Sequence, residues 1–385
     1  MGITDVTTLI SRIMIKMRKG RGRFRSPAMA VRDHDGVYAE VWFPTSGCRW
    51  NFAGRCTMCN YGHPEPVAPE QMLRAVAEGL AALKGQPRIL WVGAFNVFDD
   101  REVPPEIRHR LFDILALSDC EHVILETHPQ SVDREKVASC KRILGNRRVD
   151  IQIGIESSSD FVREVCINKG LDRTAISRAI KEIHAGGAGC YGNLVVGAPF
   201  LDAHDAYVDA LASVHDTLSI GCDNVCIFPL HVKPHTLLHW LHARGQHEPI
   251  SLWALADIYA ALPDEQRGRV YHAWITPVDH PGAEKCLAPE VDPQCGDQLI
   301  HNLTRFQQSR DPAAMAWLVE TSTPARERWR ARRLAGDGCT AAERAAAALP
   351  QLCDEFLGQG MWREVGSSIL ADLRQRWHKE LENRL

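Results

Sequence analysis

Short apolar runs rich in β-branched residues alternate along the chain with longer stretches in which apolar residues recur every three or four positions. The short runs predict buried strands and the longer stretches predict amphipathic helices, as in the series Leu73, Val76, Leu80 and Leu83. The predicted strands are residues 38–43, 88–93, 122–126, 150–155, 191–196 and 223–228. The predicted helices are residues 69–83, 105–117, 133–144, 174–185 and 204–218.

A strand followed by a helix, repeated every 30 to 40 residues, is typical of βαβ units in a parallel sheet. Six such units can form a curved, partly open barrel, but a doubly wound open sheet gives the same alternation. Both architectures place their chemistry at the carboxyl ends of the strands. Here these ends are rich in Gly, Pro and polar residues: SGCRW, GAFN, ETHP, GIESSS, GAPF and FPLH.

The alternation divides the chain into four predicted regions. Residues 1–34 form a basic N-terminal segment, 35–245 the α/β core, 246–310 an irregular, Cys-containing segment on the substrate side, and 311–385 a helical extension. Residues 12–25 carry seven Lys or Arg and no acid, which indicates a solvated tail or a contact for RNA. Residues 326–333 carry five Arg, but Trp329 among them indicates a helix with one packed face.

Composition excludes several classes of protein. With 385 residues, 45% hydrophobic and 24% charged, the chain matches an ordinary globular protein and not a disordered one. A net charge of -3 argues against a generally basic nucleic-acid binder. No apolar stretch reaches ~18 residues, which argues against a membrane span. The positive charges follow the first apolar run, the reverse of a secretory signal, so we expect a cytoplasmic protein.

Cysteine is the informative residue type. The chain has 13 of them, an odd number, so they cannot all be paired with one another. Isolated ones are expected to be packing residues: Cys120, Cys140, Cys166 and Cys190. Cys48, Cys56 and Cys59 instead form C-x7-C-x2-C directly after the first predicted strand.

Three thiolates in one loop are a soft ligand set, suited to an iron–sulfur cluster or to zinc. His63 could complete a Cys3His zinc site, and plain packing is a third interpretation. On a [4Fe–4S] cluster, three cysteines leave one iron without a protein ligand, free to bind a cofactor or substrate.

The blocks around this loop resemble the radical S-adenosylmethionine (radical SAM) superfamily. The sequence is most similar to the radical subunit of archaeosine synthase, in the group that includes elongator, MiaB and NifB. The resemblance runs from about Asp35 to about Asp311, and INKG after GIES is an uncommon combination. The matching blocks are TSGCRWNFAGRCTMCNYG, LWVGAFNVFDDREVP, VILETHPQSV, GIESSSDFVREVCINKGL, NLVVGAPFLDAHDAYVD and FPLHVKPHTLLHWLHARGQHEPISLWAL. The longer first gap departs from the widespread C-x3-C-x2-C spacing.

The resemblance implies an α/β fold, a partial (βα)6 TIM-like barrel with an α-helical C-terminal extension. It implies an enzyme whose Cys48, Cys56 and Cys59 hold a [4Fe–4S] cluster that cleaves S-adenosylmethionine, giving a 5'-deoxyadenosyl radical that removes a hydrogen atom from the substrate. The residues it implies for cofactor binding are Trp50, Gly93, Ala94, Asn96, Glu126, Glu156 and Arg163. Simpler interpretations stay open: Glu126 and Glu156 as helix N-terminal charges, Arg163 as a solvated charge, and Gly93 as a turn residue.

The substrate and partners are less well defined. The family's block before FLDAHD carries a lysine where this chain has Gly197 or Ala198, which favours a small polar substrate (a nucleoside, sugar or amino-acid conjugate in specialised biosynthesis) over tRNA. We expect a flavodoxin or ferredoxin-type electron donor and no membrane partner. A non-enzymatic, zinc-stabilised α/β binding protein is the alternative of a different class.

Two further groups of residues are candidates. The histidines and lysine after the sixth strand could line a substrate pocket: His231, Lys233, His235, His239 and His242. Cys286 and Cys295, helped by His280 or Cys339, could hold a second metal, a catalytic thiol being the other interpretation.

Overall fold

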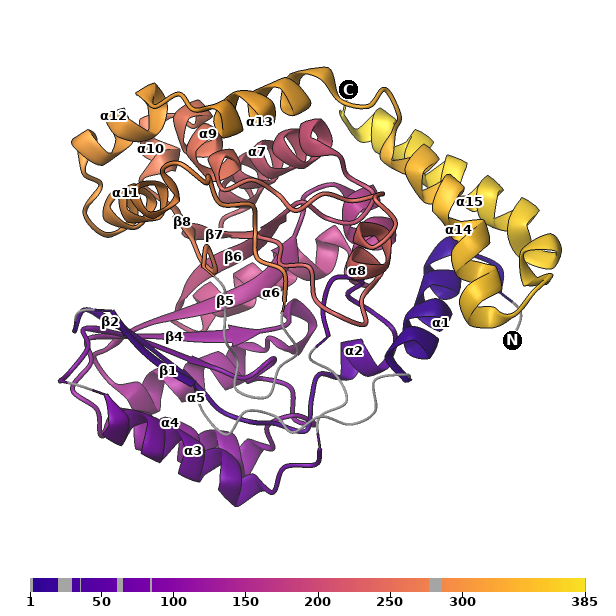
Figure 1. The fold of residues 1–385 in the computed structure, drawn as a ribbon. Helices are drawn as coiled ribbons and strands as arrows, with labels where there is room; N and C mark the ends of the chain where they lie inside the picture. The colour runs from indigo at the N-terminus through magenta and orange to yellow at the C-terminus, as the bar shows by residue number, and fades with distance from the viewer. Residues whose placement is uncertain are drawn as a thin grey trace.

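An eight-stranded sheet in the order β1 to β8 organises the protein (Figure 1). The structure, a computed structural model, describes residues 3–19, 30–34, 36–60, 65–83, 85–276 and 286–384. Strands β2 to β8 are parallel, and β1 pairs antiparallel with β2. The strands are β1 (Ala30–His34), β2 (Tyr38–Trp42), β3 (Ile89–Gly93), β4 (His122–Thr127), β5 (Arg148–Glu156), β6 (Gly189–Val196), β7 (Asn224–Pro229) and β8 (Val270–His272).

The strand order decides between the two predicted architectures. A doubly wound sheet reverses its strand order at a switch point, whereas here every strand lies beside its neighbour in sequence. The sheet curls into a half-barrel with helices outside it, which confirms the partial TIM-like barrel (Figure 1). The six predicted strands correspond to β2 to β7, and β1 and β8 are additional.

The helices between the strands follow the predicted positions to within one or two residues. They are α3 (Pro69–Ala82), α4 (Pro105–Ala116), α5 (Arg134–Leu144), α6 (Arg173–Ala185) and α7 (Ala203–Ser219). Three of these helices begin at an aspartate whose side chain accepts backbone N–H bonds: Asp133, Asp172 and Asp202. These local signals explain why the helix starts were readable from the sequence.

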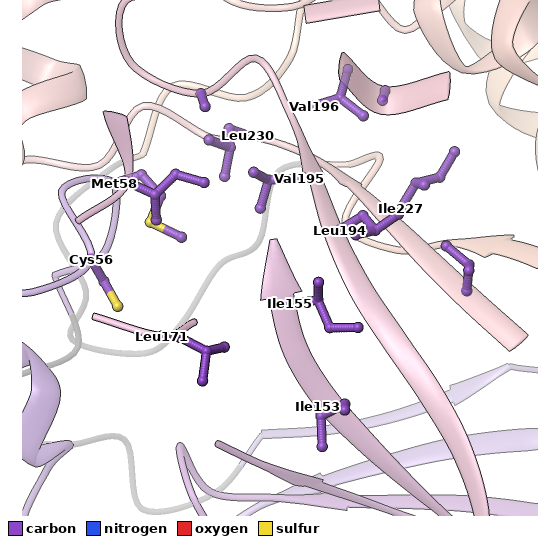
Figure 2. Close-up of a cluster of buried hydrophobic side chains, with 14 of the residues drawn as sticks. Cys56, Met58, Ile153, Ile155, Leu171, Leu194, Val195, Val196, Ile227 and Leu230 are labelled. Atoms are coloured by element: carbon purple, nitrogen blue, oxygen red, sulfur yellow. The ribbon is translucent and has the colours of Figure 1, made fainter. Parts of the chain in front are cut away.

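The core lies between this outer helical layer and the sheet. Ile153 on β5, Leu194 on β6 and Ile227 on β7 are fully buried in it, and Cys56 and Met58 belong to the same cluster (Figure 2). The four cysteines expected to be packing residues are all buried, as predicted: Cys120, Cys140, Cys166 and Cys190.

The region after residue 245 is more regular than predicted. It contains β8, which extends the parallel sheet by one strand beside β7, so the alternation does not end where the sequence indicated. Strand β8 has only three residues, too few to show a period. The helices here are α9 (Trp253–Ala261), α10 (Asp264–Arg267) and α11 (Gly296–Ser309), and α8 (Leu237–His242) lies just before this region.

The basic N-terminal stretch is not a solvated tail over its described part. Residues 6–19 form helix α1 (Val6–Lys19), which packs against two long C-terminal helices (Figure 1). Its apolar residues share one buried face: Val6, Leu9, Ile10, Ile13, Met14 and Met17. The C-terminal region is helical as predicted, with α12 (Pro312–Glu320), α13 (Pro324–Ala335), α14 (Ala341–Leu357) and α15 (Met361–Arg384).

Helix α13 carries the arginine-rich stretch and packs as Trp329 predicted. Trp329 and Arg326 are each 1% exposed, and both donate to Asp257 on α9. None of the helices in the described ranges is long and apolar enough to cross a membrane.

Candidate functional site

The three motif cysteines lie on one loop, residues 47–60, at the carboxyl end of β2; we call it the cysteine loop. Cys48 precedes the short helix α2 (Arg49–Phe52), and the Cys59 N–H donates to the Cys56 carbonyl at 2.9 Å. Cys56 is buried and has a positive φ of 57°, a conformation that costs free energy for a residue other than glycine. Such strain persists only where the surrounding structure holds the residue firmly.

The loop is held by the segment Cys166 to Gly170, which contains the INKG motif. The Cys56 N–H donates to the Asn168 carbonyl at 3.2 Å, and the Thr57 N–H donates to the Ile167 carbonyl at 2.9 Å. The Asn168 amide nitrogen donates to the Gly54 carbonyl, and its oxygen accepts from Arg55. The INKG motif therefore holds the cysteine loop in place through these hydrogen bonds.

A buried ion pair lies beside the loop. The Lys169 ammonium contacts the Glu156 carboxylate at 2.6 Å, and both residues are less than a tenth exposed. Burial alone would lower the pKa of Lys169, but Glu156 and the nearby Cys56 and Cys48 thiols raise it. Gly154 leaves the space for this pair, because a Cβ there would lie 2.6 Å from the Glu156 carboxylate. Sequence reasoning named Glu156 but missed Lys169, although it noted INKG.

The surroundings of the motif cysteines raise the pKa of two of the three thiols. Burial, with Glu102 and Cys56 nearby, raises the pKa of Cys48; burial also raises the pKa of Cys56 to about 11, against the effect of Lys169. Within the described residues no group of three or more His, Cys, Asp or Glu side chains could hold a metal ion. A [4Fe–4S] cluster takes its thiolates on separate irons, so they need not converge on one point. His63 lies outside the described residues.

The loop after β3 is shaped by a buried carboxyl that sequence reasoning missed. Oε1 of Glu102 accepts from the N–H groups of Phe95 and Asn96 and from the Thr45 hydroxyl, all within 3.1 Å. Its Oε2 is buried without a hydrogen-bond partner in the described part of the chain. Burial raises the pKa of Glu102 to about 7. Its only sequence signal was its place in the block LWVGAFNVFDDREVP.

Three predicted cofactor residues at this edge have different surroundings. Gly93 lies against the Trp91 ring, where a Cβ would be 1.8 Å from a ring carbon, and the next residue, Ala94, is buried. The Asn96 amide is engaged with Thr127, His128 and Ser131, so this side chain joins the loops after β3 and β4.

Trp50 and Arg163 are also packed into the frame of the site. The Trp50 ring stacks on His128, with ring centroids 3.8 Å apart. Arg163 is 1% exposed, so it is not a solvated charge; it donates to the carbonyls of Ser157 and Leu171 and to Asp160. Both side chains therefore position loops around the cysteines.

Glu126 faces the interior of the half-barrel. The Asn193 amide donates to it at 3.4 Å across β5. Burial and the neighbouring Glu156 raise the pKa of Glu126 to about 8, against the effects of Lys169 and Lys233. At neutral pH this carboxyl is mostly protonated and can donate a hydrogen bond.

Aromatic rings line the interior near Glu126. Trp42 packs on Trp91 with centroids 4.4 Å apart, and Trp274 lies 6.1 Å from Trp42. The Lys233 ammonium lies 4.8 Å from the centre of the Trp274 ring, and His231 is 6.4 Å from that ring. Sequence reasoning missed the three tryptophans, because which rings meet depends on the curl of the sheet.

The remaining histidines are dispersed. His239 is exposed, His235 is half-buried, and Nδ1 of His242 contacts the carbonyl of His247. Of this series, His231 and Lys233 lie against Trp274.

The second metal site is not assembled in the described residues. Cys286 and Cys295 are half-buried and Cys339 is exposed, and in the described part of the chain none of the three belongs to a group of three or more side chains that could hold a metal ion. His280 lies outside the described ranges.

Known sequences similar to this chain include two named archaeosine synthase subunit beta. The protein of Methanosarcina acetivorans is 28% identical over 285 residues, 72% of this chain and 80% of its own length. The protein of Thermococcus kodakarensis is 28% identical over 244 residues, 59% of this chain and 72% of its own. Together with three cysteines on one loop of a parallel half-barrel, these relatives support a radical SAM protein.

The predicted similarity to archaeosine synthase is thus confirmed. No family model matches the chain. Among solved structures, methylornithine synthase aligns over 80% of this chain and 90% of its own, with a TM-score of 0.47 and 13% identity.

Proposed function

We propose that this radical SAM protein is an enzyme that cleaves S-adenosylmethionine reductively at a [4Fe–4S] cluster and acts on a small polar substrate. One observation carries the proposal: Cys48, Cys56 and Cys59 share a loop seated on INKG, next to the buried Lys169 ammonium. Soft thiols beside a buried positive charge suit an anionic iron–sulfur cluster.

When bound, the cluster would supply the electron for reductive cleavage of the cofactor and so the radical chemistry that acts on the substrate. The thiolates of Cys48, Cys56 and Cys59 would hold it. The backbone of Gly93 and Ala94 would face the methionyl part, and the unpartnered oxygen of Glu102 is an acceptor for its amino group. Glu126 and Glu156, at the ends of β4 and β5, would contact the rest of the cofactor.

The remaining predicted residues would act through the shape of the site. Asn96 and Arg163 hold the loops after β3 and β5, and Trp50 covers His128. The half-barrel would keep the radical close to one C–H bond and away from water.

The substrate would lie against the interior wall. Trp42, Trp91 and Trp274 offer apolar ring surfaces, while Glu126 and Lys233 offer hydrogen-bonding groups. This mixture suits a small molecule with a ring or alkyl part and polar groups. The basic stretch that was a candidate RNA contact has an inward-facing arginine, Arg18 on α1, and in the other arginine-rich stretch Arg326 on α13 is also buried.

A tRNA substrate is the second candidate, favoured by the relatives named archaeosine synthase. The proposal also includes a flavodoxin or ferredoxin-type electron donor in the cytoplasm. Binding of tRNA that weakens steeply with salt would favour this second substrate.

The test is anaerobic reconstitution with iron and sulfide, followed by dithionite and S-adenosylmethionine and chromatography for 5'-deoxyadenosine. Cys56→Ala should lose the cluster and the product. Cys140→Ala, a buried cysteine on α5, is the matched control and should keep both. A colourless wild-type protein that holds zinc and never cleaves the cofactor would overturn the proposal.

A further inference from the structure

Arg18 reaches from helix α1 into the cysteine loop. It is 3% exposed, and its guanidinium donates to four backbone carbonyls of that loop: Asn51 at 2.6 Å, Arg55 and Cys56 at 2.8 Å, and Cys59 at 2.9 Å. Two of the four carbonyls belong to motif cysteines. One side chain therefore ties the start of the loop to its end, in a forked geometry that arginine provides and lysine does not.

The charge of Arg18 has an unusual environment. In the described ranges no carboxylate pairs with this guanidinium, although buried charges are normally paired. Burial lowers the pKa of Arg18, and the negative charges nearby that oppose this are Cys59, Cys56 and Cys48. If the three motif cysteines bind a metal as thiolates, their negative charge would balance this buried cation.

The helix that carries Arg18 is itself held in place. A Cβ on Gly54 of the cysteine loop would lie 2.1 Å from the Ser11 carbonyl of α1, so helix and loop are in direct backbone contact. At the other side, Asp372 of α15 accepts the Val6 N–H at 2.8 Å. Helix α15 also pairs Arg376 with Glu164, which lies in the turn η2 (Val162–Cys166) just before INKG.

We infer that Arg18 is a positioning residue for the iron–sulfur site, holding the cysteine loop in its ligating shape and balancing the charge of the cluster-bound thiolates. The charge-balancing role rests on the proposed function, because it needs a bound cluster. The hydrogen bonds that hold the cysteine loop exist in the protein without metal as well. It also gives the C-terminal helices a role, since α14 and α15 support α1 against the loop.

The experiment compares Arg18→Met, which removes the charge and all four hydrogen bonds, with Arg18→Lys, which keeps only the charge. Lys16→Met is the matched control, because Lys16 is exposed on the same helix. Three quantities are measured: hydrogen–deuterium exchange of residues 48–60 without metal, the lifetime of the reconstituted cluster under chelator, and its midpoint potential.

Both Arg18 variants should exchange faster in the loop, by tenfold or more, and lose the cluster sooner than Lys16→Met does. The midpoint potential should become more negative in Arg18→Met, because a nearby cation stabilises the more negative reduced cluster, and should move less in Arg18→Lys.

Loop exchange and cluster lifetime equal to the control in both variants would overturn the positioning role. An unchanged potential in Arg18→Met would overturn the charge role. A wild-type protein that binds no cluster would contradict the proposed function, while the exchange data would still decide the role of Arg18 in the loop.

Discussion

The Lys169 ammonium lies 2.6 Å from the Glu156 carboxylate and joins the end of β5 to the motif that seats the cysteine loop. Glu156 adopts a positive φ of 72°, so the pair also holds a strained backbone position. An ion pair at this depth depends on both members, because either charge alone is buried without compensation.

Lys169→Met should therefore destabilise the fold by about 3–5 kcal/mol, the usual effect of leaving one buried charge unpaired. Urea denaturation measures the loss. Arg110→Met, which breaks an exposed pair with Glu70, is the control and should cost about 0–1 kcal/mol.

Glu156→Gln combined with Lys169→Met removes both charges and should recover part of this loss. A double variant as unstable as the sum of the single variants would show that the two residues do not stabilise each other.

Gly54→Ala should separate α1 from the cysteine loop. A methyl group there meets the Ser11 backbone at 2.1 Å and must also adopt a φ of 76°. Gly245 has a similar φ of 67° and open space around it, so Gly245→Ala isolates the backbone strain, about 1–2 kcal/mol.

Thermal unfolding should show a clearly larger fall in melting temperature for Gly54→Ala than for Gly245→Ala. Equal falls in melting temperature would mean that the contact between Gly54 and α1 does not contribute to stability.

Glu126 should make stability depend on pH. Its pKa is about 8 in the fold, above its ordinary value of 4.5, so folding favours the protonated form. The stabilisation is fully present below about pH 4.5 and is lost as the pH rises towards and through 8.

Glu126→Gln should therefore reduce the fall in unfolding free energy between pH 5 and pH 8.5, on the order of 3 kcal/mol. Denaturant titrations of both proteins at the two pH values test this. An identical fall in both proteins would place the pKa of Glu126 near its ordinary value.

Asp257 fastens α13 to α9. It accepts from Arg326 at 3.0 Å and from the Trp329 indole at 3.1 Å, and it pairs with Arg333 at 3.2 Å. Asp257→Asn should cost about 3–5 kcal/mol because it leaves buried Arg326 without its counter-ion, and should expose the C-terminal helices to limited proteolysis. Glu327→Gln, which changes an exposed pair on the same helix, should leave both the melting temperature and the cleavage pattern unchanged. Equal behaviour of the two variants would contradict the role of Asp257.

The sequence alone determined the six central strands, the five helices between them and the loop that carries Cys48, Cys56 and Cys59. The strands were readable as short apolar runs, the helices from a period of about 3.6 residues that reports burial of one face, and the loop from the spacing of its cysteines. Helix α1 shows the same periodicity from Val6 to Met17, but its basic residues favoured a solvated segment; its burial depends on α14 and α15, more than 300 residues away.

Only the tertiary structure decided that the strands follow one another into a half-barrel, and that β8 extends it. It also decided which side chains meet at the cysteines. Arg18, Glu102 and Lys169 come from distant segments, and no local pattern distinguishes a buried arginine or lysine with a partner from a solvated one. The physical reason is that the local hydrophobic pattern shows which residues of an element are buried in the core. The site consists of contacts between loops that are far apart along the chain, and such contacts leave no pattern in the sequence.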